Sequence, residues 1–158
     1  MGNDRLLPTL DDALTVSGLD PSQLCIEITE TALLRQSATA SANLAGIHDR
    51  GVTLAIDNFG TGYASLLSLR RYPIDVIRID RNFVTSITTD VRDRAFAVAI
   101  VTLANSLGMA VTAEGVEHLD QADCLRDMGC PGAQGWLYSK ALPADQVTPL
   151  LDYAYPHS

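Results

Sequence analysis

Short apolar segments alternate with segments of helical periodicity along most of the chain, and this alternation restricts the fold more than any other feature. Five segments have strand length, at residues 24–29, 52–56, 75–79, 109–113 and 133–138. Because these segments read as continuous apolar runs rather than as alternating ones, we expect parallel strands covered by helices. The chain has 158 residues, of which 47% are hydrophobic, so it can bury one domain core.

The segments between the strands are predicted to be helices. We expect helices over residues 10–16, 31–50, 91–107, 119–128 and 144–153, and a shorter helix that ends at Arg71. A glycine closely follows each of the first four, which is typical of a helix C-terminus. A glycine-rich turn is expected over residues 59–62.

The alternation leaves a choice between an open sheet and a (β/α) barrel. No G-x-G-x-x-G or G-x-x-x-x-G-K-[ST] loop follows the first strand, so the usual signal of a nucleotide-binding open sheet is missing. Each strand instead runs into polar or acidic residues at its carboxyl end. In parallel barrels this end of the strands builds the active site, which favours the barrel.

The glutamates are concentrated at two of these strand ends. The chain has four, Glu27, Glu30, Glu114 and Glu117, in two E-x-x-E pairs, whereas aspartate supplies the other 15 acidic residues. Carboxylates from separate strands that converge on one rim suit Mg²⁺ or Mn²⁺, which prefer oxygen ligands. The alternative is that these acids are solvated loop residues and helix caps.

Charge and cysteine content exclude several other classes. The net charge of −8 argues against a surface that binds DNA or RNA. The three cysteines are odd in number and form no C-x-x-C, which argues against a disulfide framework or a structural zinc site. Because no apolar run reaches the roughly 20 residues of a membrane span and the N-terminus lacks a basic start followed by an apolar segment, we predict a cytoplasmic protein.

Three long strings in this sequence resemble the EAL domain family, bacterial phosphodiesterases that hydrolyse cyclic di-GMP. They are CIEITE (25–30), LAIDNFGTGYASLLSLRRYPIDVIRIDRNFV (54–84) and VTAEGVEHLDQADCLRDMGCPGAQGWLYSKALP (111–143). We expect a single EAL-type domain over residues 1–158, with a leading helix region at 1–18 and the family match over 19–158. The resemblance implies a modified TIM barrel in which two divalent metals activate water and yield linear pGpG.

The resemblance also implies roles for individual residues. By their place in the family motifs, the metal ligands are Glu27, Asp57 and the position of Asn58, and the catalytic positions are Arg78, Glu114 and Gln134. Glu30 matches a glutamate that steadies the D-x-F-G-T-G loop, a segment also tied to dimerisation. That loop would comprise Phe59, Gly60, Thr61 and Gly62.

Two site positions depart from the family pattern. Asn58 replaces the second of two adjacent aspartates, which removes one negative charge and is expected to weaken the second metal. Arg78 stands where the K-I-D motif has a lysine that contacts the catalytic water. A guanidinium is a wider fork than an ammonium, so this exchange is not conservative.

A third departure concerns completeness. No E-A-L string occurs in the chain, and the asparagine ligand of a later family strand is also absent. Because TIM barrels need about 250 residues, we expect a partial TIM-like (β/α) barrel of about five parallel strands that lacks the N-terminal strands. The unpaired sheet edges of such a piece predict a homo-oligomer.

Three functions remain open on the sequence alone. The first is a cyclic di-GMP phosphodiesterase that needs Mg²⁺ or Mn²⁺ and missing ligands from elsewhere, and is impaired as this chain. The second is a degenerate module that binds cyclic di-GMP or another protein without catalysis. The third is a fragment held together by oligomerisation.

Overall fold

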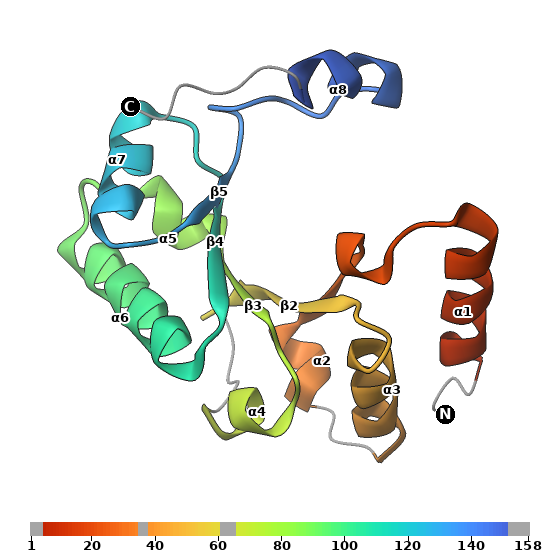
Figure 1. Ribbon diagram of the computed structural model, residues 1–158. Coiled ribbons are helices and arrows are strands. Elements are labelled where there is room, and N and C mark those ends of the chain that lie inside the picture. The colour runs from red at the N-terminus through yellow and green to blue at the C-terminus, as the bar shows by residue number, and fades with distance from the viewer. Residues whose placement is uncertain (1–4, 35–37, 61–65, 152–158) are drawn as a thin grey trace.

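The computed structural model describes residues 5–34, 38–60 and 66–151 (Figure 1). The helices are α1 (Leu6–Ser17), the short 3-10 helix η1 (Pro21–Gln23), α2 (Glu30–Leu34), α3 (Ala38–His48), α4 (Leu66–Arg71), α5 (Arg81–Thr85), α6 (Val91–Leu107), α7 (Leu119–Asp127) and α8 (Ala144–Leu151). The strands are β1 (Cys25–Thr29), β2 (Thr53–Phe59), β3 (Val76–Ile79), β4 (Ala110–Glu114) and β5 (Gly132–Gln134).

The five strands form one sheet in which every pair is parallel and the order is β1-β2-β3-β4-β5. This arrangement confirms the predicted α/β class of parallel strands alternating with helices. The ladder between β2 and β3 is interrupted: Ile56 pairs with Ile77, but Phe59 pairs with Ile79. One extra residue on β2 therefore forms a bulge, a feature that re-aims side chains near functional sites.

The two faces of the sheet differ, contrary to the expected continuous apolar runs. Alternate residues such as Leu54, Ile56, Ile77 and Val111 are almost fully buried. The residues between them, such as Glu27, are more exposed in most strands. The helical face is thus hydrophobic and the other face is largely polar. Small residues such as Ala55 and Ala110 lie between the long aliphatic ones and read as apolar, which hides the alternation in the sequence.

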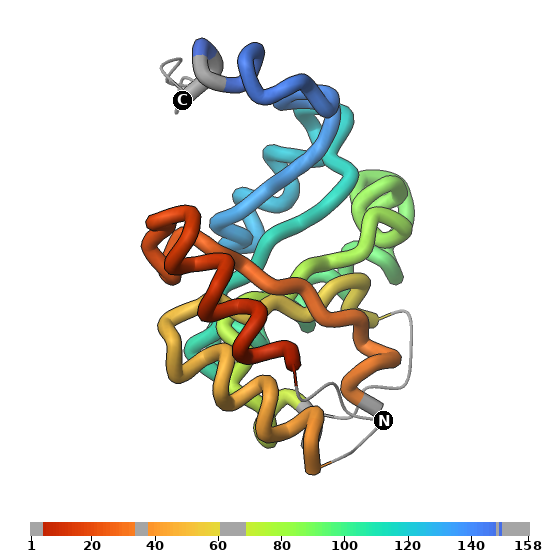
Figure 2. The backbone as a smooth tube through the Cα atoms, turned by 90° about the vertical axis from the view of Figure 1, so that its right-hand side faces the viewer, coloured from red at the N-terminus to blue at the C-terminus, as the bar shows by residue number. Residues whose placement is uncertain are grey.

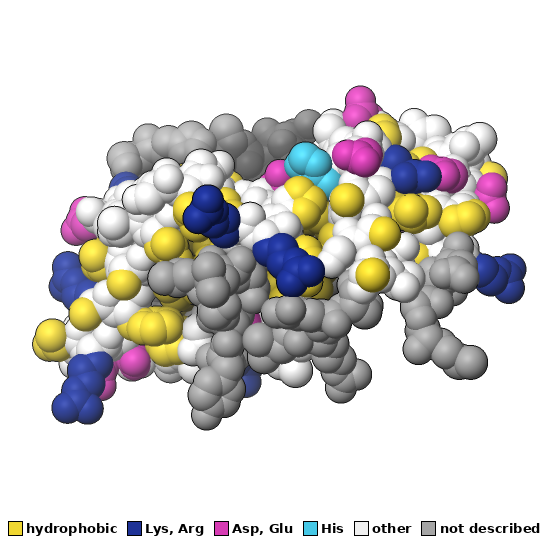
Figure 3. All heavy atoms as spheres, turned by 90° about the horizontal axis from the view of Figure 1, so that it is seen from below, with side chains coloured by type: hydrophobic (Ala, Val, Ile, Leu, Met, Phe, Trp, Pro, Cys, Tyr) yellow, Lys and Arg dark blue, Asp and Glu magenta, His cyan; other side chains and the backbone are white. Residues whose placement is uncertain are grey.

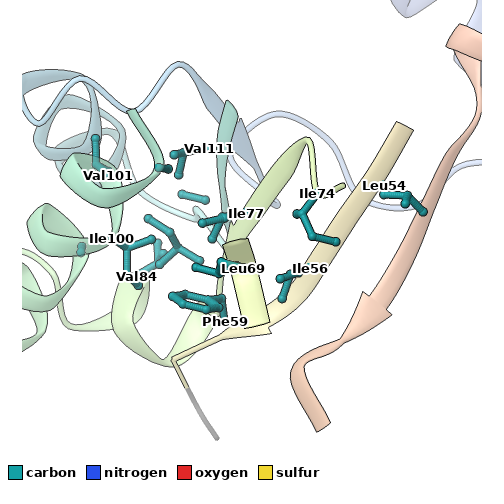
Figure 4. Packing of buried hydrophobic residues seen from close by; sticks show 14 of the residues in the cluster. Leu54, Ile56, Phe59, Leu69, Ile74, Ile77, Val84, Ile100, Val101 and Val111 are labelled. Atoms are coloured by element: carbon teal, nitrogen blue, oxygen red, sulfur yellow. The ribbon is translucent and has the colours of Figure 1, made fainter. Parts of the chain in front are cut away.

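The hydrophobic core lies between the sheet and the helices on its convex side (Figures 1 and 4). Figure 4 shows Ile77, Leu69, Phe59 and Val84 pointing toward one another from β3, α4, β2 and α5. Because these side chains are buried and tightly grouped, the core fixes the strands while leaving the opposite face free to carry charge.

Most predicted helices are confirmed, but α1 begins at Leu6 rather than at residue 10. The segment expected to be a helix over 31–50 contains α2 and α3, and residues 35–37 between them lie outside the described part. Helix α5 was not predicted; it begins after Asp80, whose carboxylate accepts a hydrogen bond from the Asn82 N–H at 2.7 Å. A five-residue helix is too short for periodicity to reveal, although the N-cap aspartate marks its start.

The fifth strand is shorter than predicted. It ends at Gln134 rather than at 138, and Trp136 and Tyr138 lie in the turn that follows it. Phe59, expected in the glycine-rich turn, is the last residue of β2 and is buried. The expected loop positions Thr61 and Gly62 lie outside the described residues.

The two ends of the described chain lie apart. Helix α1 lies beside α3, while α8 extends from β5 away from the sheet (Figure 2). On the face seen from below, the Lys and Arg side chains are scattered, some among hydrophobic groups and some beside Asp or Glu side chains (Figure 3). Among the described helices, none is long and apolar enough to cross a bilayer.

Candidate functional site

The carboxyl halves of the five strands place one set of polar residues on the open face of the sheet, which we call the polar rim. Its members are Glu27 from β1, Asp57 and Asn58 from β2, Arg78 from β3, Glu114 from β4 and Gln134 from β5. All of them were named from the sequence as candidate site residues. Their separation in sequence is large, so the parallel sheet is what brings them to one place.

Arg78 lies at the centre of the polar rim and contacts three of its members. Its Nη2 is 2.6 Å from Glu27 Oε1, and its Nη1 is 2.6 Å from Glu114 Oε1. The same Nη1 lies 3.4 Å from Gln134 Oε1, a longer hydrogen bond. One guanidinium thus joins β1, β3, β4 and β5.

The environment of Arg78 is partly buried. Its side chain is 17% exposed, against 45% for Glu27 and 23% for Glu114. Burial by itself would lower the pKa of Arg78, but the hydrogen bond to Glu114 and the charges of both glutamates outweigh it and raise the pKa. The Nε atom is buried and makes no hydrogen bond within the described chain, so the two carboxylates are the main compensation for burying this charge.

Asp57 and Asn58 occupy the bulge of β2. Asn58 has a positive φ of 54°, a conformation that asparagine tolerates better than most residues. Its Nδ2 donates a hydrogen bond of 2.7 Å to Asp57 Oδ2. The asparagine amide therefore neighbours the Asp57 carboxylate directly and reduces its freedom to turn toward another ligand.

Glu30 lies behind the polar rim rather than on it. The residue is only 4% exposed, and its Oε2 accepts a hydrogen bond of 3.0 Å from the Gly60 N–H. Gly60 has φ 98°, and a Cβ at this position would overlap the ring of Phe96, which stacks on Phe83 at 4.5 Å between centroids. Glu30 is thus hydrogen-bonded to Gly60, the residue that follows β2 and lies against a tightly packed aromatic pair.

Gln121 is a site-supporting residue that the sequence analysis missed. Its Oε1 accepts hydrogen bonds from the Glu117 and His118 N–H groups at 2.8 and 3.0 Å. Its Nε2 donates to the Val84 carbonyl oxygen at 3.2 Å. This buried amide fixes the loop that follows Glu114. A glutamine at the third position of a helix is the signal that could have revealed it.

A cavity of about 650 Å³ opens beside the polar rim. Glu114 and Gln134 border it on the rim side, together with Arg81, Trp136 and Lys140. Trp136 is 64% exposed, and the Lys140 ammonium lies 5.2 Å from the centre of its ring. Lys140, the single lysine of the chain, was not singled out from the sequence.

The polar rim in this arrangement does not fit the two-metal site that the family resemblance implies. Arg78 already engages Glu27 and Glu114, and an amide stands beside Asp57 at position 58. Within residues 5–34, 38–60 and 66–151, no group of three or more His, Cys, Asp or Glu side chains could hold a metal ion. A divalent cation normally needs several oxygen ligands turned toward one point.

The family model described as the EAL domain matches residues 1–141, so the chain belongs to the EAL domain family. The EAL domain of Mycobacterium smegmatis DcpA is a similar solved structure, with a TM-score of 0.90 and 35% identity, covering 98% of this chain and 70% of that one. Klebsiella pneumoniae BlrP1 in a manganese and cyclic di-GMP complex has a TM-score of 0.81 and 34% identity, covering 87% and 35%.

A curated relative is the bifunctional diguanylate cyclase/cyclic di-GMP phosphodiesterase MucR of Pseudomonas aeruginosa. It is 38% identical over 142 residues, which are 90% of this chain and 21% of MucR. The chain spans about a fifth of the length of the curated relatives that it matches. At these identities the comparisons show the family and the fold, and divalent metal ions occur in structures of its members.

Proposed function

We propose that this chain is an EAL domain of cyclic di-GMP signalling in the cytoplasm that binds the dinucleotide but hydrolyses it poorly. The observation that carries the proposal is the position of Arg78, which is paired with both Glu27 and Glu114. In the family-derived assignment, Glu27, Asp57 and Asn58 hold Mg²⁺ or Mn²⁺ and Glu114 is essential. With these groups engaged by one another, metal-activated water would form inefficiently.

Ligand binding is supported by the cavity beside the polar rim. Arg81 and Lys140 on its border are cations of the kind that pair with phosphodiester oxygens. The exposed ring of Trp136 offers a surface on which a purine base can stack. The combination of charge and an aromatic surface suits a cyclic dinucleotide better than a nucleic acid duplex, which needs a longer basic surface.

The test is to measure binding and turnover separately on the same protein. We expect calorimetry to detect cyclic di-GMP binding, and chromatography to detect no pGpG beyond one turnover with Mg²⁺ or Mn²⁺. Trp136→Ala should weaken binding about tenfold, because stacking on one aromatic ring contributes about 1–3 kcal/mol per base. Arg126→Gln, a surface change on α7, is the matched control and should bind normally.

Two results would contradict the proposal in different ways. Multiple-turnover release of pGpG would show that the polar rim is catalytically competent as it stands. Failure to bind cyclic di-GMP would instead favour the alternative of a protein-interaction module or a fragment held by self-association.

Self-association is the second part of the proposal. Within the described sheet, β1 and β5 are the outer strands, and each has one neighbouring strand. An unprotected outer strand presents free backbone donors and acceptors, which favours pairing with another chain. We therefore propose that the chain forms a homo-oligomer through these strands.

A further inference from the structure

Arg78 bridges strands that are not neighbours. Its two terminal nitrogens each lie 2.6 Å from a carboxylate oxygen, one on β1 and the other on β4. In the sheet order, β2 and β3 separate β1 from β4. The bridge therefore crosses the open face of the sheet and ties together strands that no backbone ladder connects directly.

The strand register explains how Arg78 reaches Glu27. Glu27 lies opposite Ala55 of β2, which lies opposite Val76 of β3, two residues before Arg78. Ala55 is fully buried even though it lies on the open face, so larger side chains cover it. A single methyl group at this position leaves the path between Arg78 and Glu27 open.

A guanidinium and a divalent cation compete for the same carboxylates. Mg²⁺ needs carboxylate oxygens at about 2.0–2.1 Å in an octahedral arrangement. An ion between Glu27 and Glu114 would displace Arg78 from both and would stand beside its positive charge. Because the guanidinium stays protonated at any physiological pH, it cannot make room by losing its charge. Partial burial reduces the screening of that repulsion by solvent.

We infer that Arg78 is a resident cation of the polar rim: it takes the position of a divalent ion between Glu27 and Glu114 and keeps Mg²⁺ and Mn²⁺ from binding there. The inference goes beyond the proposed function, because it concerns the polar rim without any nucleotide. The planar fork of arginine is what allows one side chain to bond both carboxylates, and a lysine ammonium has no matching geometry.

A Mn²⁺ titration of the 158-residue protein, without nucleotide, tests the inference. Electron paramagnetic resonance measures the free ion, and calorimetry measures the bound ion. The natural protein should show no saturable binding that depends on Glu27 and Glu114. Arg78→Met should bind one Mn²⁺ at least about tenfold more tightly than the natural protein does, because the substitution removes the competing charge and frees both carboxylates.

Arg78→Lys provides a graded variant, and Arg126→Met a matched control. Lysine keeps the charge but frees at least one carboxylate, so Mn²⁺ affinity should lie between those of the natural protein and Arg78→Met. Arg126 pairs with Asp123 on the exposed surface of α7, so its replacement should leave Mn²⁺ binding unchanged. Addition of Mn²⁺ should raise the melting temperature of Arg78→Met and not that of Arg126→Met.

The inference can be tested even if Arg78→Met does not fold. Saturable Mn²⁺ binding by the natural protein that Glu27→Gln or Glu114→Gln weakens would overturn the inference. A folded Arg78→Met or Arg78→Lys protein with no gain in affinity would overturn it as well. Because no nucleotide is present, these results are independent of cyclic di-GMP binding, whose loss contradicts the proposed function alone.

Discussion

Gly135 shows how closely the backbone approaches itself next to the polar rim. A Cβ at this position would overlap the backbone of Val116, in the loop after β4. Around this contact, the Val116 N–H donates to the Gln134 carbonyl oxygen at 3.1 Å, and the Leu137 N–H donates to the Val116 carbonyl oxygen at 3.0 Å. The absent side chain therefore lets the end of β5 lie directly against the loop that follows Glu114.

Gly135→Ala is expected to destabilise the protein and to displace Gln134. Steric overlap with backbone atoms cannot be relieved by a rotamer change, so the loss should be about 1–3 kcal/mol or more. Urea denaturation measures this loss, and cyclic di-GMP calorimetry reports the displacement of Gln134 and Trp136. Gly129→Ala is the control: its φ is +77° but nothing lies within 4 Å of the added Cβ, so it should cost about 1–2 kcal/mol and leave ligand binding intact. Equal ligand affinity in the two variants would contradict this interpretation.

The residues of the polar rim were predictable, but their contacts were not. Four glutamates in two E-x-x-E pairs and polar groups at successive strand ends pointed to one edge of a parallel sheet. The pairing of Arg78 with Glu27 depends on the register across β2 and on the small side chain of Ala55. Neither the register nor the small side chain of Ala55 can be inferred from the residues next to Arg78 or Glu27 in the sequence.

At the scale of elements, prediction succeeded where both ends of an element carry local signals. Helix α6 matches its predicted range of 91–107, because Asp90 caps its start and Gly108 closes it in the left-handed conformation. Strand β5 was predicted too long, because the apolar and aromatic residues after Gln134 resemble a strand although they form a turn. Trp136 borders the cavity and Leu137 packs against the core, and apolarity alone does not separate these uses from that of a strand residue.

The contact of α1 with α3 is both packed and charged. A Cβ on Gly46 would lie 2.6 Å from Leu7 Cδ1, so the glycine allows α1 to lie close to α3. Arg50 Nη2 lies 2.7 Å from Asp11 Oδ2, and its Nη1 donates to the Gly46 carbonyl oxygen at 2.6 Å. Arg50 therefore holds α1 to the end of α3 beside the packed contact.

The Asp11–Arg50 pair predicts a pH-dependent contribution to stability. The hydrogen bond from Arg50 lowers the pKa of the Asp11 carboxyl below its ordinary value of 3.8. A carboxyl with a lower pKa in the folded chain stabilises the fold above its unfolded pKa, and this stabilisation is lost as the pH falls through the folded pKa. We expect Asp11→Asn to lower the melting temperature slightly at neutral pH, since the pair is exposed.

The pH series distinguishes this pair from a general effect of charge. The difference in melting temperature between the natural protein and Asp11→Asn should shrink as the pH falls below 3.8, the ordinary pKa of this carboxyl. High salt at neutral pH should also reduce it. Asp12→Asn changes the neighbouring charge on the same helix and serves as the control. A difference that stays constant over the whole pH range would refute the role of the Asp11 carboxylate.

At the scale of the whole molecule, charge on β1 restricts how two copies can pair. In a symmetric pairing of β1 with β1, the strands run antiparallel, and the five residues Cys25–Thr29 place Glu27 at the centre. Two like charges would then lie opposite each other, which is destabilising. Pairing of β1 with β5 of a second copy avoids this opposition and continues the parallel sheet. Such head-to-tail contacts form a closed ring only if the rotation that relates neighbouring copies adds up to a full turn. They therefore also permit assemblies larger than a dimer.

The expected result is therefore a concentration-dependent assembly rather than a monomer. Light scattering should give at least twice the monomer mass of 16.9 kDa at micromolar concentration. Cys25 is exposed on β1, so association through this strand should slow its reaction with a maleimide as the protein concentration rises. Cys130 provides the internal reference: burial raises the pKa of its thiol, so its reaction should be slow at every concentration. A mass of 16.9 kDa, together with Cys25 reactivity that does not depend on concentration, would show that the outer strands are protected without a second copy.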